Sequence, residues 1–312
     1  MGIMNSQTGE ERRAGAEAIG RAAAEMRADA LTAIHAAGSG HPGGTLSILD
    51  ATAVLYLDVA RHDPARPDWP DRDRILFSAG HKAPALYAAL AWCGYFPKDL
   101  LWTLRQVGSP LQGHPDMKKL AGVEVSTGSL GQGLGIGAGM AMALRLDGRA
   151  SRVFVLMGDG EQQEGSVWEA AMAAAHHRLG NLVGVVDLNG LQIAGPVAEV
   201  MDIRPIREKY EAFGWRALEV DGHDVEALRA TFRRAVEPDG RPTVVLLHTV
   251  KGKGVSFMEN QAGWHGVATK SREQLDQALA DVARALPAVA GGGSAADPAE
   301  VDRRLAVAAT WK

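Results

Sequence analysis

The feature that most constrains the fold of this sequence is a regular alternation of short apolar segments with longer amphipathic ones after residue 150. Four apolar segments have the length and composition of strands: 152–157 (RVFVLM), 182–188 (LVGVVDL), 215–220 (WRALEV) and 243–249 (TVVLLHT). Helices are predicted between them at 164–178, 203–212 and 224–235. Buried strands that alternate with helices are typical of a parallel sheet with helices on both faces. We therefore predict an α/β fold of this kind.

The first half of the chain fits the same plan. Helices are predicted at 9–37 and 46–57, then up to residue 92, and again in a glycine- and alanine-rich stretch at 130–146; RILFS (74–78) is a predicted strand. The segments GSGHPGGT and 105–128 are predicted loops. After Pro287, AVAGGGSAADP has the composition of a linker. We predict one domain over 1–287, a linker at 288–298 and a tail helix at 299–312.

Composition excludes several functional classes. The net charge of −4 gives no bulk attraction for nucleic acid or anionic membranes. No apolar run approaches the ~20 residues needed to span a bilayer, and MGIMNSQTGEERR lacks the apolar core of a signal peptide. Its match to the loose myristoylation pattern is attributed to chance. The single cysteine, Cys93, is predicted to be a small buried thiol, which indicates a reducing, cytoplasmic location.

Polar residues follow two of the predicted strands. The first strand ends in Gly158-Asp159-Gly160, and the second ends in Asp187-Leu188-Asn189. In an open parallel sheet, ligands bind beyond the carboxyl ends of the strands. If the two strands are neighbours, Asp159 and Asn189 meet there and offer oxygen ligands that suit Mg²⁺, with Ca²⁺ or Mn²⁺ as alternatives, rather than zinc. Taken alone, Gly-Asp-Gly is more often a simple turn.

Four of the ten histidines lie beside glycines in predicted loops: His41, His81, His114 and His265. One such histidine is usually a solvated loop residue, but four suggest a shared pocket. Imidazole can donate, accept or shuttle protons near neutral pH, which suits the hydroxyls and carbonyl of a sugar. A structural or surface role is predicted for His35, His62, His176, His177 and His248, and His223 is left open.

Two glycine-containing segments suggest nucleotide binding only superficially. STGSLGQGLGIGAGMA lacks the G-x-G-x-x-G spacing and the preceding strand of a dinucleotide site. We interpret it instead as a helix whose small residues allow close packing against a cofactor or partner. Lys251 and Lys253 alternate with glycines but do not match a phosphate-binding loop of the Walker type, so a surface loop is predicted there.

Taken together, the motifs resemble transketolase, specifically its N-terminal half, from about residue 18 to about residue 270. They are GSGHPGG, SAGH, QGHPD, STGSLGQGLG, GDGEQQEG, DLNGLQI and KGKGVSFMENQAGWHG, in the order of the family. The resemblance implies Mg²⁺ and thiamine diphosphate as cofactors, with Asp159, Asn189 and the Leu191 carbonyl on the metal. It implies substrate-facing or catalytic histidines at His41, His114 and His265. It implies cofactor contacts from His81, Gly128, Ser129, Leu130, Gly158, Gly160, Glu164, Asn189 and His265, with Glu164 also at a subunit interface.

The glutamate that activates the aminopyrimidine ring in transketolase lies in a second α/β domain, and no such domain follows here. The resemblance therefore implies one half of a split transketolase that acts on sugar phosphates. The expected assembly is α₂β₂, in which the partner is a C-terminal, pyrimidine-binding subunit. The expected reaction is transfer of a two-carbon ketol unit. The alternatives are another thiamine diphosphate-dependent subunit, either deoxyxylulose phosphate synthase-like or a pathway-specific ketol transferase, and a non-catalytic cofactor-binding module. A nicotinamide dehydrogenase is the more distant enzyme alternative.

Overall fold

The computed structural model describes residues 15–284 and 297–311. The pattern considered for myristoylation, the first six residues of the helix predicted at 9–37, and residues 288–296 of the predicted linker lie outside these ranges. The domain boundaries drawn from the sequence therefore stay predictions. Within the two ranges, no helix has the length and apolar character needed to cross a membrane.

Five parallel strands form the central sheet, in the spatial order β1-β2-β3-β7-β6. They are β1 Arg74–Phe77, β2 Val153–Gly158, β3 Leu182–Leu188, β6 Arg216–Asp221 and β7 Thr243–His248. Each agrees with the predicted strand to within one residue at either end. A small antiparallel hairpin, β4 Leu191–Gln192 with β5 Gly195–Pro196, follows β3 and had no counterpart in the sequence prediction. The predicted α/β fold with a parallel sheet is confirmed.

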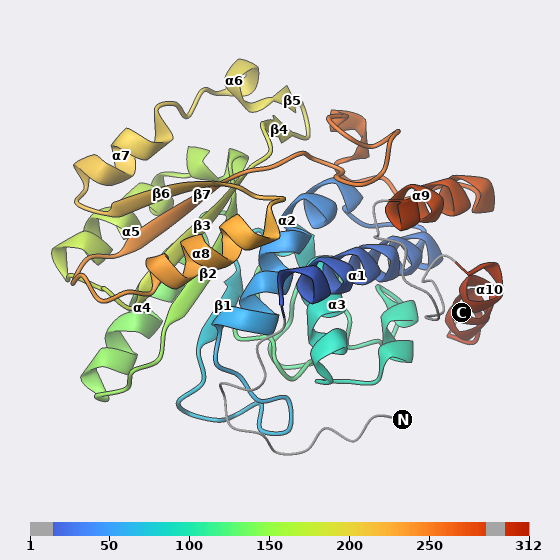
Figure 1. Ribbon diagram of the computed structural model, residues 1–312, viewed down its shortest axis with the longest axis horizontal. Helices are drawn as coiled ribbons and strands as arrows, with labels where there is room; N and C mark the ends of the chain where they lie inside the picture. Colours follow the sequence, from blue (N-terminus) through green and yellow to red (C-terminus); the bar gives the residue numbers. More distant parts are fainter. Residues whose placement is uncertain (1–14, 285–296, 312) are drawn as a thin grey trace.

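The helices cover both faces of this sheet (Figure 1). They are α1 Ala16–Ala37, α2 Pro42–Val54, α3 Ala83–Cys93, α4 Gln132–Leu146, α5 Gly165–His176, α6 Val197–Val200, α7 Ile206–Ala212, α8 Val225–Ala235, α9 Arg272–Arg284 and α10 Pro298–Ala309. Short 3₁₀ segments lie at Gly80–Lys82, Lys98–Thr103, Gly160–Gln163 and Ala262–Trp264, and a π-helical turn, Leu55–Val59, follows α2.

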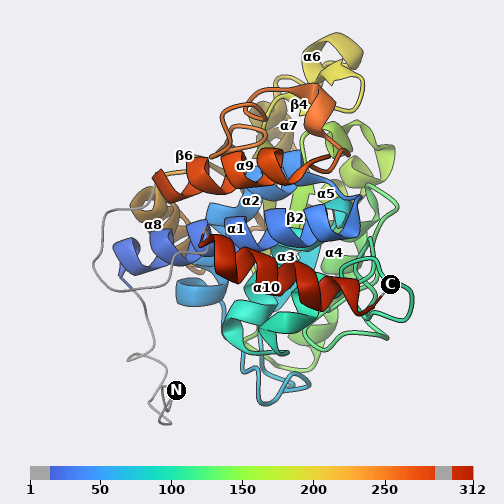
Figure 2. The same cartoon turned by 90° about the vertical axis from the view of Figure 1, so that its right-hand side faces the viewer.

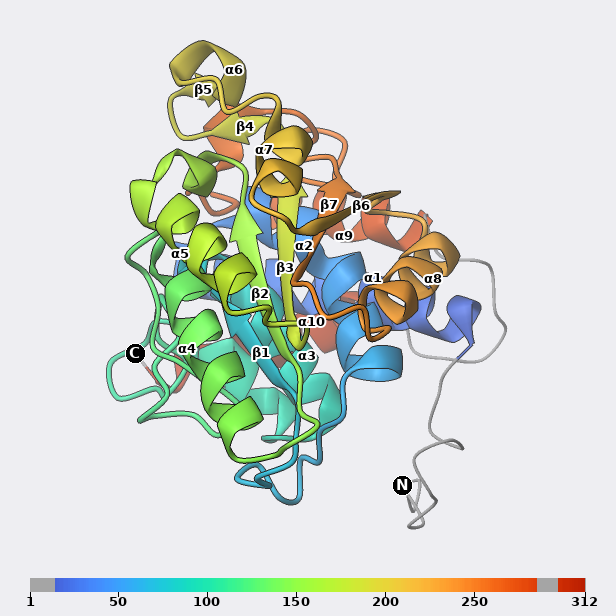
Figure 3. The ribbon, with the colours of Figure 1, turned by 90° about the vertical axis from the view of Figure 1, so that its left-hand side faces the viewer.

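Side chains alternate between two hydrophobic clusters, as the pleat of a strand requires. In β2, Phe154 and Leu156 belong to the cluster that contains α1, α2, α3 and α8. Val155 and Met157 belong to the other, with α4, α5 and α7. Figure 3 shows α4 and α5 on one side of the strands and α1 and α8 on the other. Because the strands are apolar on both faces, they are fixed at the centre of the fold, and their carboxyl ends present the loops that follow them.

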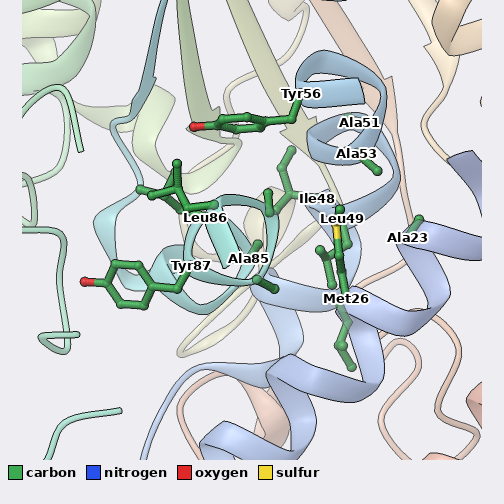
Figure 4. Packing of buried hydrophobic residues seen from close by; sticks show 14 of the residues in the cluster. Ala23, Met26, Ile48, Leu49, Ala51, Ala53, Tyr56, Ala85, Leu86 and Tyr87 are labelled. Atoms are coloured by element: carbon green, nitrogen blue, oxygen red, sulfur yellow. The ribbon is translucent and has the colours of Figure 1, made fainter. Parts of the chain in front are cut away.

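In the larger cluster, α1, α2 and α3 pack against one another through small and branched side chains. Figure 4 shows Met26 of α1, Leu49 of α2 and Leu86 of α3 among the buried side chains of this cluster. On the outer side, α1 lies between α9 and α10 (Figure 2). The tail helix is held there by a buried ion pair in which Arg304 Nη1 lies 3.0 Å from Asp29 Oδ1. The predicted tail helix is thus docked on α1.

One helix begins earlier than predicted. GSGHPGGT was predicted to be a loop, with the helix beginning at residue 46, whereas α2 begins at Pro42. Proline is well suited to the first helical position because its missing N–H needs no partner there. Gly43 and Gly44, which follow, lie in the first turn of the helix, where buried side chains approach them closely. A glycine pair is more typical of a loop, which explains the difference from the prediction.

The glycines of α4 face in two directions. A Cβ on Gly133 would lie 2.3 Å from the side chain of Ser78, and one on Gly137 would lie 2.4 Å from Val155. Gly139, by contrast, has nothing within 4 Å of such an atom. Close packing was predicted against a cofactor or partner, but at Gly133 and Gly137 it is against the sheet of this chain. Gly135 and Gly139 are on the exposed face.

This difference predicts opposite effects of the same substitution. Gly137→Ala should destabilise the chain by about 1–3 kcal/mol, because the added methyl overlaps a rigid β-branched side chain. Gly139→Ala should stabilise it by about 1 kcal/mol, because alanine is the better helix former at an open position. Urea unfolding followed by circular dichroism measures both. Equal effects of the two substitutions would contradict this packing.

Candidate functional site

A pocket of ≈350 Å³ opens at the carboxyl edge of the sheet. Segments that follow β1, β2, β3 and β7 all contribute to it, which is where ligands bind in open parallel sheets. The lining residues are His41, His81, Lys82, His114, Gly128, Leu130, Gly158, Asp159, Gly160, Glu161, Gln163, Glu164, Asn189, Leu191, Gln192, Ile193, Lys251 and His265. Most of the residues proposed from the sequence therefore surround one cavity.

The loops after β2 and β3 are joined through Asp159. The two strands pair in parallel, with Gly158 opposite Asp187. Asp159 Oδ1 accepts a hydrogen bond from the Gly160 N–H at 2.7 Å, and Oδ2 accepts one from the Gly190 N–H at 2.5 Å. These bonds bring Asp159 and the loop of Asn189 together, as expected for neighbouring strands.

Asp187 is the buried acceptor that organises the other side of the pocket. It is fully buried and accepts hydrogen bonds from Ser47, Lys82, Asn189 and Thr249. The Lys82 Nζ lies 2.6 Å from Asp187 Oδ2. Burial alone would raise the pKa of Asp187, but the Lys82 ammonium and the hydrogen bonds lower it below its usual value. Asp187 is therefore ionised and already paired, and it is not free to bind a metal.

Asp159 is in the opposite electrostatic situation. Burial and the nearby Asp187 carboxylate raise the pKa of Asp159 to about 6. Lys82 offsets only part of this shift, and no side chain in the described ranges forms an ion pair with Asp159, so a divalent cation would supply the missing positive charge. The Asn189 Oδ1 accepts from the Leu191 N–H at 3.2 Å, so it retains a second lone pair. The donor set of carboxylate, amide oxygen and loop carbonyl fits Mg²⁺.

No group of three or more His, Cys, Asp or Glu side chains within the described ranges has the arrangement of a metal site. A cation here has to draw on the amide and carbonyl oxygens and on a ligand that brings its own oxygens. Mg²⁺ behaves in this way with phosphate ligands, because it usually takes only one or two protein carboxylates.

Lys251 lies inside the pocket, which corrects the sequence prediction of a surface loop. Its side chain is 2% exposed. The Nζ donates to the Leu191 carbonyl at 2.9 Å and lies 3.0 Å from His265 Nδ1. Burial and the neighbouring Lys82 lower the pKa of Lys251 to about 8. Lys253, two residues later, is only half-buried, as a surface loop residue would be.

Two glycines of α2 make room for the buried lysines. A Cβ on Gly43 would lie 3.0 Å from Lys251 Cε, and a Cβ on Gly44 would lie 3.1 Å from Lys82 Cε. Lys82 follows β1, and Lys251 follows β7. In an open parallel sheet, residues after every strand can reach the ligand site. The position of the two lysines after β1 and β7 is therefore the sequence signal that points to them.

Glu161 is a further buried group that was not singled out from the sequence. It accepts hydrogen bonds from Ser78 Oγ, from the Gly131 N–H at 2.9 Å and from the Gly158 N–H at 3.0 Å. These bonds tie the end of β1, the start of α4 and the loop after β2 to one carboxyl group. Burial raises the pKa of Glu161. Its partners are all within the chain, so its place in the site is to hold these loops together.

The four proposed histidines converge in the pocket. Neighbouring ring centroids lie between 5.2 and 6.3 Å apart. Burial, followed by nearby cations, lowers the pKa of His41 to about 4 and that of His265 to about 3. Burial likewise lowers the pKa of His81 and His114. All four imidazoles are therefore neutral near pH 7, and each has one N–H donor and one acceptor nitrogen with which to contact a ligand or a neighbouring side chain.

Not every residue proposed from the sequence lies in the pocket. Ser129 is exposed and is absent from the lining, although Gly128 and Leu130 on either side of it contribute. Glu164 is exposed at the rim.

Cys93 is only half-buried rather than fully buried, and burial raises the pKa of its thiol to about 12, so it is not a nucleophile. His223, left open by the sequence, hydrogen-bonds to Asp50 outside this pocket.

The protein has a parallel sheet covered by helices, and the carboxyl edge of this sheet carries neutral histidines and oxygen donors that suit Mg²⁺. This arrangement is typical of a domain that binds a diphosphate cofactor. The family model described as "Transketolase, thiamine diphosphate binding domain" matches residues 19–280. The chain belongs to this family, and the resemblance drawn from its motifs is confirmed.

Relatives and solved structures agree with this assignment. The chain is 42% identical over 230 residues to the 6-deoxy-6-sulfo-D-fructose transketolase subunit of a Clostridium species, covering 74% of this chain and 84% of that protein. It is 42% identical over 250 residues to an apulose-4-phosphate transketolase subunit of Phocaeicola vulgatus, covering 80% and 88%. The transketolase structure from Leishmania mexicana superposes with a TM-score of 0.82 at 30% identity. That match covers 96% of this chain but 46% of the Leishmania chain, so this chain spans less than half of it.

Proposed function

We propose that this chain is the N-terminal, diphosphate-binding subunit of a split transketolase. With a C-terminal, pyrimidine-binding partner it transfers a two-carbon ketol unit from a ketose phosphate to an aldose. The observation that carries the proposal is the meeting of an oxygen-donor set with four neutral histidines in one pocket. Bacterial relatives of similar length that are named as subunits support the split arrangement.

The pocket suits Mg²⁺ and thiamine diphosphate. Asp159, Asn189 Oδ1 and the Leu191 carbonyl would hold the metal, and Gly158, Gly160 and His81 lie where a diphosphate would meet the backbone and an imidazole. Lys82 and Lys251 provide the local positive charge that a chain of net charge −4 lacks in bulk. When bound, thiamine diphosphate supplies the nucleophilic carbon and the electron sink for breaking and forming the C–C bond.

The remaining residues act on the sugar. His41, His114 and His265 are the proposed catalytic histidines, because their neutral rings face the same cavity. They would donate hydrogen bonds to the ketone oxygen of the donor and to the aldehyde oxygen of the acceptor, where negative charge develops. They would also exchange protons with the neighbouring hydroxyl groups. His265, beside Lys251, would contact both the cofactor and the sugar.

Exposed apolar side chains on two neighbouring helices and at the pocket are compatible with a second kind of subunit. In α4 and α5, Ile136, Leu146 and Met172 are 38%, 81% and 56% exposed, and Ile193, which lines the pocket, is 76% exposed. A partner that covered these side chains would remove apolar surface from water. The buried Glu161 is fully engaged within the chain, so the glutamate for the aminopyrimidine ring would come from the partner. An α₂β₂ assembly, with Glu164 at the subunit interface, is the proposed arrangement.

A pathway-specific ketol transfer is the second candidate. Two relatives, each 42% identical to this chain, are named for different unusual sugars, a sulfosugar and an apulose phosphate. Relatives at this level of identity to the chain are therefore named for more than one sugar. A cytoplasmic location is proposed as well, because a single half-buried cysteine requires no oxidising compartment.

Co-expression of the chain with a C-terminal, pyrimidine-binding transketolase subunit, followed by a screen of donor and acceptor sugars, tests the proposal. We expect ketol transfer that requires the partner, thiamine diphosphate and Mg²⁺ together, and none from the chain alone. Turnover by the chain alone would contradict the split site. A complex that binds NADH and not thiamine diphosphate would favour the dehydrogenase alternative.

A further inference from the structure

We propose that Arg105 is a positioning residue that fixes the tautomer of His41, so that His41 presents an Nε2–H donor to the substrate. This inference rests on the proposed function and deepens it, because it assigns His41 one of the two roles that a neutral histidine can have. Arg105 lies in the segment after the 3₁₀ turn Lys98–Thr103 and had no role assigned from the sequence.

The contact between the two side chains determines which nitrogen carries the proton. Arg105 Nη2 lies 3.3 Å from His41 Nδ1. A guanidinium group can only donate hydrogen bonds, and it stays charged at every relevant pH. His41 Nδ1 must therefore accept, which leaves the ring proton on Nε2. Nε2 lies across the imidazole ring from Nδ1, beside Gly266. His41 lines the pocket, so Nε2 is the nitrogen left to contact a substrate.

Arg105 is held in place at a local cost. Its φ is 60°, in the left-handed region that non-glycine residues rarely occupy. Its guanidinium group also contacts Ser39 Oγ at 3.4 Å and the Gly113 carbonyl at 3.5 Å. A Cβ on Gly113 would lie 3.0 Å from Arg105 Cζ, so glycine there leaves room for the guanidinium group.

No carboxylate forms an ion pair with Arg105 anywhere in 15–284 or 297–311. A strained, unpaired cation beside a histidine adds little to stability, whereas it can orient that histidine. Such strain is typical of residues that serve a functional site.

The electrostatics agree with this geometry. After burial, Arg105 is the largest cause that lowers the pKa of His41, and it also lowers that of His114. The charged and titratable groups around His41 are Arg105, His81, His114, His265 and Lys251. None of them is an acid, so nothing in this set favours a protonated His41. His41 is therefore a neutral hydrogen-bond donor, which stabilises the negative charge that develops on a substrate oxygen.

The direct test is ¹⁵N NMR of histidine-labelled full-length chain, alone and with its partner, with the His41 signal assigned by its loss in His41→Asn. In the wild type we expect a proton on Nε2 and none on Nδ1. Arg105→Met should mix the two tautomers and raise the pKa of His41. Arg105→Lys, which keeps a cationic donor, should restore most of the Nε2–H form. Lys119→Met is the control. Lys119 and Arg105 line a second cavity, separate from the histidine pocket, but Lys119 does not contact His41.

A second variant reaches the same contact by another route. Gly113→Ala keeps Arg105, but the added Cβ would lie 3.0 Å from Arg105 Cζ, so the guanidinium group has to shift from its present place beside His41 Nδ1. The tautomers should then mix as in Arg105→Met. In the active complex, either variant should lower kcat on the order of tenfold with little change in KM. This is less than the roughly 10²–10⁴-fold that a whole acid–base group contributes, because both variants keep His41 itself. The acidic limb of the kcat/KM profile should move to higher pH, because His41 would then become charged at a higher pH.

The proposal would be overturned by a wild-type His41 that carries its proton on Nδ1, or by an Nε2–H form that neither Arg105→Met nor Gly113→Ala changes. A rise in KM with unchanged kcat would instead make Arg105 a substrate-binding residue and would also overturn it. The NMR measurement requires neither cofactor nor turnover. A failure of the proposed ketol transfer would therefore be seen separately from a failure of this inference.

Discussion

Replacing Asp159 with alanine is expected to abolish Mg²⁺-dependent binding of thiamine diphosphate. Asp159 has no ion-pair partner among the described residues, whereas the neighbouring Asp187 is paired with Lys82. Loss of an outer-sphere partner of a metal weakens binding by about 10–100-fold, and loss of a direct ligand should exceed that. The measurement is calorimetric titration of the cofactor into the reconstituted complex, with Mg²⁺ present.

The fold should survive this substitution. The pKa of Asp159 is raised to about 6, so folding makes this carboxyl group harder to ionise than it is in the unfolded chain. Any stability that it contributes is present below the unfolded-state pKa and is lost as the pH rises through 6. At pH 7, alanine therefore removes an unfavourable buried charge along with two hydrogen bonds. Asp202→Ala, which removes an exposed carboxylate just after α6, is the control. An Asp159→Ala complex with wild-type cofactor affinity would contradict the metal assignment.

The second large effect is expected from Lys82→Met, which should destabilise the chain by roughly 3–5 kcal/mol. Methionine keeps most of the apolar stem, but Asp187 loses the only ammonium bonded to it within the described residues while staying fully buried. An unpaired buried carboxylate is far more costly than the loss of a surface ion pair. Urea unfolding at pH 7 measures the change in the free energy of unfolding.

Two comparisons isolate this buried pair. Adding Asp187→Asn to Lys82→Met removes the stranded charge and should recover a large part of the lost stability. Lys253→Met, which disrupts a part-exposed 3.8 Å pair with Glu259, should change stability by less than about 1 kcal/mol. The pH dependence has a fixed sign. Because the pKa of Asp187 is lowered, its stabilisation is present above the unfolded-state value and is lost on acidification through the folded-state value. A Lys82→Met chain as stable as the wild type would show that the pair adds nothing.

The sequence predicts those parts of the site that depend on order along the chain. Asp159 and Asn189 follow consecutive apolar segments, and consecutive strands of a parallel sheet are usually neighbours, so their meeting could be anticipated. Glycine beside histidine marked His41, His81, His114 and His265 as residues of backbone segments that approach a ligand. The alternation of apolar segments was sufficient for the central sheet.

The sequence does not predict parts of the site that depend on distant contacts. A lysine is exposed by default. Lys82 is buried because Asp187 accepts from it across more than a hundred residues, and Lys251 is buried because Gly43 leaves space above it. Arg105 has no motif, and only its approach to His41 marks it. The helix at 272–284 has no counterpart in the sequence prediction, although its pattern is amphipathic, because it lies after the last motif of the site.

The measurement that tests the shared site most directly is the titration of thiamine diphosphate into the wild-type complex of this chain with its pyrimidine-binding partner. The titration is made in Mg²⁺, in excess EDTA, and again after Mg²⁺ is restored. The site described above predicts saturable binding of one cofactor for each copy of this chain, lost in EDTA and recovered with Mg²⁺. Binding to the chain alone should be much weaker, because the proposed partner would complete the pocket. A reconstituted complex without Mg²⁺-dependent binding of thiamine diphosphate would contradict the assignment of this pocket.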